Sequence, residues 1–172
     1  MRKKLVVASL SALMLSAASL AVAECEKGFE EVIASGSVNT TNLEGGMQTG
    51  QIALTLTSTK TGKVVFDKQG GVMGQITGVD ASGYPIKVTL NHIIRFAPDF
   101  ELDTYGDVAS VYGNPFACNV PVEEVISTYT GTKIFKQATG SIVAEGFLNL
   151  PNESGYCINN QFELSGTLCV AK

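Results

Sequence analysis

The sequence predicts an all-β domain behind a short export segment, and three observations support this. Polar and apolar residues alternate at period two over most of the chain, and clusters of Gly, Pro and Asn interrupt the alternation at regular spacing. Beyond the first residues, no window combines a helical period with an N-terminal cap. The stretch from Lys133 to Cys169 is the clearest case, because two alternating runs flank the turn-forming cluster 151–155. It predicts a long antiparallel hairpin at the end of the domain.

Residues 1–23 predict a secretory signal peptide that is cleaved after Ala23. Basic residues precede an apolar run from Leu5 to Leu20, and small residues stand at Ala21 and Ala23, where a signal peptidase reads the chain. The alternative is a transmembrane anchor, but the run is short for a span and ends at the small residues. We therefore expect an exported protein, periplasmic or extracellular, with one domain over residues 24–172.

The charge of the chain argues against a nucleic-acid partner. The full sequence has 12 basic and 16 acidic residues and a formal charge of −4. Loss of residues 1–23 removes three of the basic residues and no acidic one, which leaves −7. No cluster of Lys or Arg occurs in the remainder, so the electrostatic footprint of a nucleic-acid-binding protein is missing.

Four cysteines, Cys25, Cys118, Cys157 and Cys169, lie in the expected mature chain. An even number in an exported protein predicts two disulfides. The competing interpretation is a zinc site, but no pair has CxxC spacing and the single histidine is distant in sequence. We expect no metal and no cofactor.

Taken in order, the alternating runs predict eight strands. The run from Gln51 to Lys60 is the most regular, with Ile52, Leu54 and Leu56 on one face. Lys63 to Phe66 is expected as a short extended piece before the glycine pair 70–71. The eight predicted strands are Phe29 to Thr40, Gln51 to Lys60, Val72 to Val79, Tyr84 to Phe96, Phe100 to Val111, Val122 to Thr130, and the two arms of the final hairpin.

A series of eight hairpin-linked strands favours closure into an antiparallel up-and-down β-barrel, because closure removes both exposed edges. A β-sandwich is the alternative. In an up-and-down barrel, Cys25 and Cys169 share one end, and Cys118 and Cys157 share the other. Because the Cα atoms of a disulfide must approach within about 7 Å, the barrel predicts the pairs Cys25–Cys169 and Cys118–Cys157.

Several segments resemble the bacterial secreted proteins with an allene oxide cyclase barrel-like domain, relatives of the plant dirigent proteins. The resemblance rests on LNHIIRF, ELDTYGDVAS, EEVISTYTGTKIFKQATGSIVAEGFLNL and FELSGTLC, and it extends from about Val32 to the C-terminus. It implies an eight-stranded barrel of the calycin or dirigent type, often oligomeric, whose apolar lumen holds a hydrophobic molecule. It assigns no catalytic residue to this chain.

Candidate ligand-binding residues are His92, Arg95, Asp107 and Tyr129. His92 shares an apolar face with Leu90 and Ile94, and its pKa range suits proton transfer, although a hydrogen-bonded core histidine has the same pattern. Asp107 is expected to share a face with Asp103 and to pair with Arg95, inside or outside the barrel. Further possible site residues are Tyr105, which could present a hydroxyl, and the carboxylates Glu124 and Glu145, which could face either way.

Four functions are compatible with these patterns. The first is a barrel that binds a small hydrophobic molecule in its lumen. The second is a cyclase or isomerase, which requires His92, Arg95 and Asp107 to converge on one open cavity. The third is a structural or interaction module with a packed barrel, possible as a homo-oligomer. The fourth is an outer-membrane barrel, which the absence of Trp and of aromatic girdles disfavours, so we expect no membrane insertion.

Overall fold

The computed structural model describes residues 25–114, 117–149 and 158–172. The export segment predicted over residues 1–23 therefore lies outside the described residues. Two one-turn 3-10 helices, η1 (Glu44–Gly46) and η2 (Lys133–Phe135), accompany the strands. The strands are β1 (Phe29–Asn42), β2 (Met47–Ser58), β3 (Val64–Asp80), β4 (Ile86–Phe96), β5 (Phe100–Val111), β6 (Val120–Ile126), β7 (Tyr129–Gly131), β8 (Thr139–Leu148) and β9 (Asn159–Ala171).

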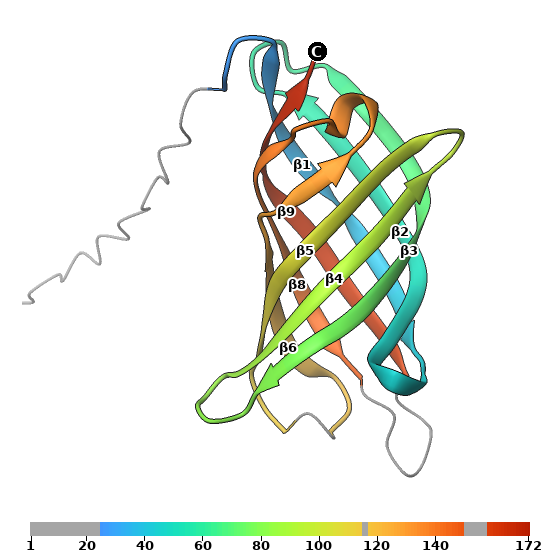
Figure 1. The fold of residues 1–172 in the computed structure, drawn as a ribbon, viewed down its shortest axis with the longest axis vertical. Coiled ribbons are helices and arrows are strands. Elements are labelled where there is room, and N and C mark those ends of the chain that lie inside the picture. Colours follow the sequence, from blue (N-terminus) through green and yellow to red (C-terminus); the bar gives the residue numbers. More distant parts are fainter. Residues whose placement is uncertain (1–24, 115–116, 150–157) are drawn as a thin grey trace, which may run out of the picture.

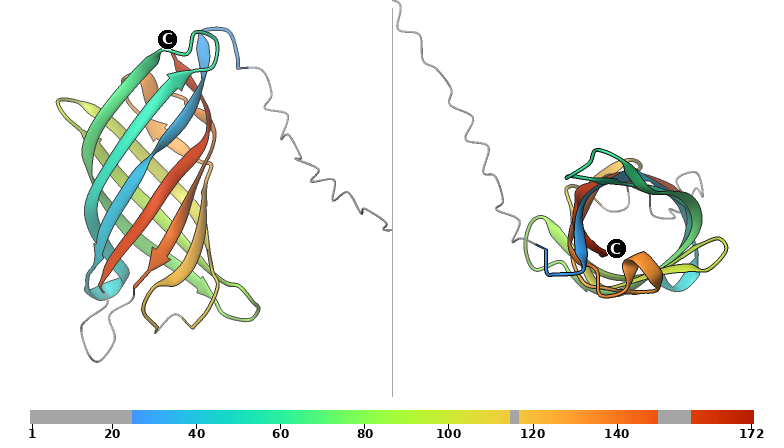
Figure 2. Two further views of the ribbon diagram at one scale, coloured as in Figure 1. Left: turned by 180° about the vertical axis from the view of Figure 1, so that it is seen from behind. Right: turned by 90° about the horizontal axis from the view of Figure 1, so that it is seen from above.

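Eight of these strands form a closed antiparallel barrel, which confirms the predicted fold class. The ring runs β1, β2, β3, β4, β5, β6, β8, β9, and β9 pairs with β1 to close it, with Val32 opposite Leu168. Figure 1 shows the tilted strands from the side, and the right-hand view of Figure 2 shows the ring from above. A sandwich would leave open sheet edges, so the closed ring excludes that alternative.

The third barrel strand is longer than predicted, because the glycine pair 70–71 does not interrupt it. The short piece expected at Lys63 to Phe66 and the run from Val72 form the single strand β3. Gly70 lies where β3 passes close to β4, and an added Cβ would lie 2.5 Å from the Arg95 carbonyl oxygen and 2.7 Å from the ring of Phe96. Gly70 thus allows the close approach of the neighbouring strand β4 and does not form a turn.

The second departure concerns the sixth predicted strand. β6 ends at Ile126, and β7 continues the same register along β5 but does not pair with β8 in the described structure. β7 is therefore a short ninth strand outside the ring. The chain then forms η2 where the first residues of the hairpin strand were predicted, and it re-enters the barrel wall at Thr139. The turn inserts Phe135 fully into the interior.

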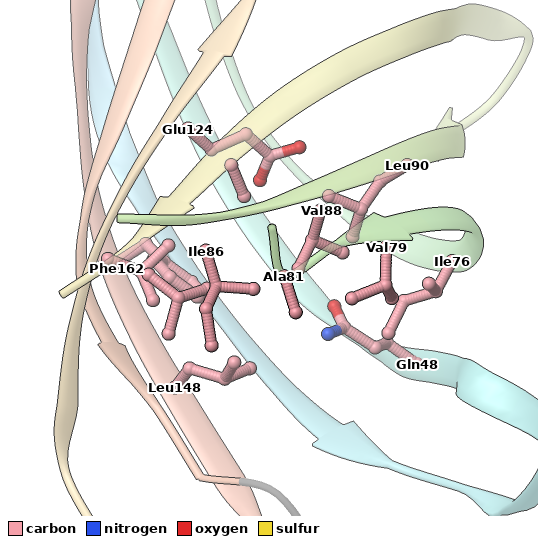
Figure 3. A pocket seen from close by; sticks show the side chains of 13 residues that line it. Gln48, Ile76, Val79, Ala81, Ile86, Val88, Leu90, Glu124, Leu148 and Phe162 are labelled. Atoms are coloured by element: carbon pink, nitrogen blue, oxygen red, sulfur yellow. The ribbon is translucent and has the colours of Figure 1, made fainter. Parts of the chain in front are cut away.

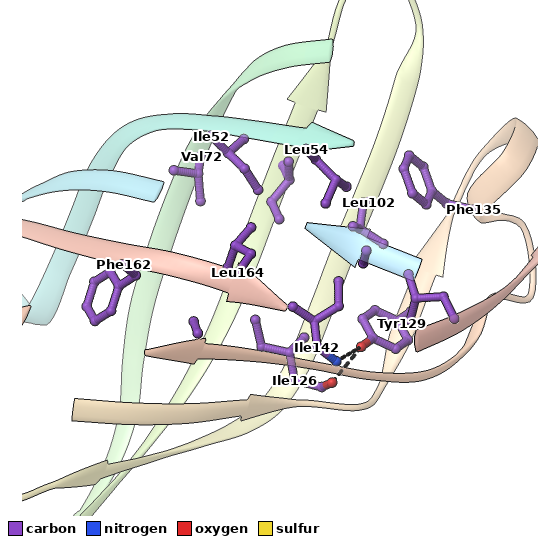
Figure 4. Close-up of a cluster of buried hydrophobic side chains, with 14 of the residues drawn as sticks. Ile52, Leu54, Val72, Leu102, Ile126, Tyr129, Phe135, Ile142, Phe162 and Leu164 are labelled. Atoms are coloured by element: carbon purple, nitrogen blue, oxygen red, sulfur yellow. Dashed lines mark hydrogen bonds between the residues drawn. The ribbon is translucent and has the colours of Figure 1, made fainter. Parts of the chain in front are cut away.

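Aromatic rings fill the end of the barrel that contains η2 and the C-terminus. Phe66 packs edge-on against Phe96, Phe100 and Phe135, with ring centroids 5.1, 5.4 and 5.1 Å away, respectively. Edge-to-face geometry at this spacing is favourable for aromatic pairs. Buried aliphatic residues from the surrounding strands continue this packing toward the middle of the barrel (Figure 4).

The Cys25–Cys169 disulfide lies at the same end, as predicted. Its Cα atoms are 5.5 Å apart, and it ties the segment before β1 to β9, the strand that closes the ring. We call this end the disulfide end and the opposite one the η1 end. The second predicted disulfide involves Cys157, which lies outside the described residues.

At the η1 end, buried asparagines join β1 to β9 and to the residue after β8. The Asn160 side-chain amide donates to Thr40 Oγ1 at 2.9 Å and to Asn42 Oδ1 at 3.0 Å, and its Oδ1 accepts from the backbone N–H of Asn149 at 2.8 Å. Asn160 is 1% exposed. Because each of these buried polar atoms has a partner, the network joins β1, β9 and Asn149 at the η1 end. In the described part of the chain, no helix has the length and apolar character of a membrane span.

Candidate functional site

Four polar side chains meet inside the barrel, about halfway along its length. His92 comes from β4, Thr104 and Asp107 from β5, and Glu124 from β6, and all four are buried. On β4, alternation places His92 inward between Leu90 and Ile94, as the sequence predicted. Polar groups in a barrel interior need partners, so their mutual geometry determines what the site can do.

A β-bulge in β5 turns Asp107 into the lumen. Leu90 lies opposite Asp107 and His92 lies opposite Thr104, so two residues of β5 face a single residue of β4. Gly106, at φ 67°, occupies the bulge, and its N–H donates to Asn91 Oδ1 at 2.9 Å. The extra residue changes the parity of the strand, as such bulges do. Asp107 therefore faces inward.

This bulge corrects the expectation that Asp103 and Asp107 share a face. Asp103 lies on the outer side, where it pairs with Arg95, and Asp107 is only 2% exposed. Val108, which follows the bulge, is on the outer surface. Gly106 itself carried the signal, because a glycine inside a strand pattern often marks a bulge.

His92 and Asp107 form a buried pair. His92 Nδ1 lies 2.9 Å from Asp107 Oδ2 and 3.1 Å from Thr104 Oγ1, and the Thr104 hydroxyl also donates to Asp107 Oδ2. Burial lowers the pKa of His92, but the hydrogen bond to Asp107 and the negative charges of Glu124 and Asp107 outweigh it and raise the pKa above 6.5. The charged form of the imidazole is therefore more stable here than in a free histidine.

Gly74 of β3 makes room for the imidazole ring. It lies opposite His92 in the β3–β4 register, and an added Cβ would lie 3.0 Å from His92 Cδ2 and 3.2 Å from Nε2. The absent side chain on β3 thus leaves space for the ring inside the barrel.

Glu124 completes the group. Its Oε1 lies 3.8 Å from His92 Nδ1, and within the described residues neither this oxygen nor Asp107 Oδ1 has a hydrogen-bond partner. Burial raises the pKa of Glu124 from 4.5 to about 7; the nearby His92 opposes this rise and the Asp107 carboxylate adds to it. Glu124 can therefore hold or release a proton near neutral pH.

An apolar cavity of about 470 Å³ lies next to this group, in the half of the barrel toward the η1 end. Two side chains with polar ends, Glu124 and Gln48, lie in a wall that is otherwise apolar, and Figure 3 shows them among the lining residues. The volume is in the range of sites for small organic molecules. The lining residues are Gln48, Ile76, Val79, Ala81, Ile86, Val88, Leu90, Ala109, Val111, Val122, Glu124, Leu148 and Phe162.

A smaller cavity of about 40 Å³ lies deeper in the barrel and is lined in part by His92. Gln48, Glu124 and Phe162 line both cavities, so these three side chains form the boundary between the apolar chamber and the histidine. The deeper space can accommodate a water molecule, which needs room and polar partners.

His92, Asp107 and Glu124 are also the described residues that could hold a metal ion, because one ligand atom from each lies within 4.8 Å of the others. Nitrogen and carboxylate oxygen donors suit several divalent metals. A metal bound at Nδ1 would replace the hydrogen bonds that this atom makes with Asp107 and Thr104. The three side chains carry no net charge when the imidazole is charged, Asp107 is ionised and Glu124 is protonated, so their charges can balance without a metal ion.

The structure does not bring Arg95 to this site. Its guanidinium lies on the outer surface, hydrogen-bonded to Asp103 and 3.5 Å from Glu101 Oε1, and its side chain is 45% exposed. The proposed Arg95–Asp107 pair is therefore wrong, because the bulge separates the two residues onto opposite faces. Tyr105 and Glu145 also lie on the exposed outer surface.

Tyr129 is buried but lies apart from the apolar cavity. Its hydroxyl donates to the Ile126 carbonyl and accepts from the Ile142 N–H at 3.1 Å, as the dashed lines in Figure 4 show. Burial raises the pKa of this phenol. Tyr129 thus joins β7 to β8 where their ladder is missing.

Comparisons with known proteins add no family assignment. No protein-family model, no curated protein and no solved structure matches the chain.

Proposed function

We propose that this barrel binds a small hydrophobic molecule in the apolar chamber between the His92–Asp107–Glu124 group and the η1 end. The observation that carries the proposal is the cavity of about 470 Å³ with an almost wholly apolar wall. Protein interiors are normally packed without voids of this size, so an apolar space that remains is a candidate ligand site. The resemblance to allene oxide cyclase barrel-like and dirigent-like proteins points the same way.

The distribution of packing supports binding over a purely structural role. Buried apolar side chains line the barrel along its length, but the cluster of packed phenylalanine rings fills the disulfide end, whereas the half toward the η1 end keeps a cavity of about 470 Å³. In this half, Ala109 and Val111 leave space along β5. A packed disulfide end and a hollow half toward the η1 end are the arrangement expected of a barrel that binds a ligand inside.

A cyclase or isomerase is the second candidate. It is favoured by Glu124, which can exchange a proton near neutral pH and lies on the chamber wall. Against it, the enzymatic interpretation required Arg95 to join His92 and Asp107, and Arg95 is on the outer surface. Binding is therefore the better-supported function.

The test uses N-phenyl-1-naphthylamine, a neutral dye that fluoresces in apolar sites. We expect the mature protein to bind the dye and Val88→Phe, which fills the chamber wall, to weaken binding by roughly ten-fold or more. The matched control is Val108→Phe on the outer surface of β5, which should leave binding unchanged. Equal loss in both variants, or undiminished binding to Val88→Phe, would contradict the proposal.

A further inference from the structure

The charge balance of the polar group restricts the head group that the chamber accepts. Two carboxylates, Asp107 and Glu124, face one imidazole, and no Lys or Arg lines either interior cavity within the described residues. With all three groups ionised, the sum is −1. Because charges interact strongly in a dry interior, this sum must be neutralised by a proton or by another cation.

Glu124 is the place where such a cation would bind. Among the described residues it is the one ionisable side chain on the wall of the apolar chamber. It is 7% exposed, and its Oε1 has no hydrogen-bond partner there. The second buried carboxylate, Asp107, also has an unpartnered oxygen, Oδ1, but its Oδ2 lies against His92 and Thr104, and Asp107 does not line the apolar chamber. A buried carboxylate oxygen without a partner has a strong need for a donor.

Two side chains that line both cavities together with Glu124 suit an ammonium group. Phe162 lines the same boundary between the two cavities, and the face of an aromatic ring attracts cations. Gln48 lies there too, and its amide oxygen can accept a hydrogen bond from a second N–H. An anionic head at this position would bring the sum to −2, and the described lining residues include no Lys or Arg to offset it.

We propose that the natural ligand is an apolar molecule with a cationic amine head, which donates to Glu124 while its apolar body fills the chamber. The ammonium replaces the proton of Glu124, so the interior stays neutral. This inference rests on the proposed binding function and deepens it by naming the ligand class.

The test compares three probes that share one alkyl chain: octylamine, octanol and octanoate. Each displaces N-phenyl-1-naphthylamine from the mature protein at pH 7.5, in buffer with a chelator that removes metal ions. We expect octylamine to bind roughly ten- to a hundred-fold more tightly than octanol, the range for a charge-assisted hydrogen bond. Octanoate should bind more weakly than octanol.

The variant Glu124→Gln removes the charge and keeps the shape of the protonated acid. It should lose the preference for octylamine over octanol. The matched control is Glu123→Gln, a half-buried outward-facing neighbour on β6, which should keep the preference.

The outcomes separate the two proposals. If no probe displaces the dye and the dye itself does not bind, the proposed function fails. If octanol binds but octylamine has no advantage, or if octanoate binds best, the amine inference is wrong and the binding function stands. The wild-type ranking decides this even if Glu124→Gln does not fold.

Discussion

Glu124→Gln should make the protein more stable at alkaline pH than the wild type. In the folded protein the pKa of Glu124 is about 7, against an ordinary value of 4.5. The folded state therefore retains a proton that the unfolded chain releases, and stability falls as pH rises through the interval between these values. Each pKa unit corresponds to about 1.36 kcal/mol, so the wild type should lose roughly 3 kcal/mol from this group between pH 4 and pH 8.

The sign follows from the proton counts in the two states. Below pH 4.5 both states bind the proton and Glu124 contributes no pH dependence. The pKa of His92 is also raised, so the stability from that pair is complete below pH 6.5 and is lost as pH rises through its folded pKa. Both proteins keep the His92–Asp107 pair, so the difference between their profiles reports on Glu124 and on the part of the His92 pKa shift that the Glu124 charge causes.

Urea unfolding of the wild type, Glu124→Gln and the control Glu123→Gln at several pH values measures this difference. We expect the free energy of unfolding of Glu124→Gln to exceed that of the wild type by an amount that grows with pH and levels off above about pH 7. The control should follow the wild type. Parallel profiles for wild type and Glu124→Gln would refute the claim that Glu124 is buried without a partner.

Three further expectations concern the bulge, the seam and the outer surface. Gly106→Ala should lower the free energy of unfolding by roughly 1–2 kcal/mol, because Gly106 has φ 67°. The control Gly71→Ala should be nearly neutral, because Gly71 has no positive φ and an added Cβ would meet open space. Equal losses for the two variants in urea unfolding would contradict this. Replacing Cys25 and Cys169 together by Ala should destabilise the protein by about 4–5 kcal/mol in the chain-entropy model, and a loss below about 1 kcal/mol would show that the barrel seam needs no covalent closure. Arg95→Gln should change the free energy of unfolding by less than about 1 kcal/mol and leave dye binding intact. Weakened dye binding would show that Arg95 contributes to the ligand site.

Much of the barrel could be predicted from the sequence because each strand has one buried face. Alternation is strict where that holds, and Ile52, Leu54 and Leu56 are buried as expected. The even number of hairpin-linked strands then favours closure, and the Cys25–Cys169 pair agrees with it. The predictions failed at local irregularities that are caused by tertiary packing.

The η2 turn is one such departure. The apolar pattern around Phe135 resembles a strand, but the ring is needed inside the disulfide end, where it packs against Phe66 and Phe96. A turn with positive φ at Lys133 and Gln137 inserts it there. Sequence alternation reports which residues are apolar and does not report that a barrel end must be filled.

The candidate site was only half predictable for the same reason. His92 keeps its predicted face because β4 is regular around it. Asp107 does not keep its predicted face, because one extra residue at Gly106 reverses the parity of β5. Glu124 was predicted to face either way, and the structure places it inward on β6, where it alternates with the buried residues Val122 and Ile126. A charged residue at a position that alternates with core residues indicates a side chain that faces the interior.

The most direct test of ligand binding inside the barrel is to measure which methyl groups a bound ligand contacts. In methyl-labelled protein with bound octanol, we predict nuclear Overhauser effects from the alkyl chain to Val88, Val111 and Leu148, whose side chains line the chamber. Contacts to Val108 and Val125 on the outer surface, with none to the chamber methyls, would contradict a ligand-binding lumen.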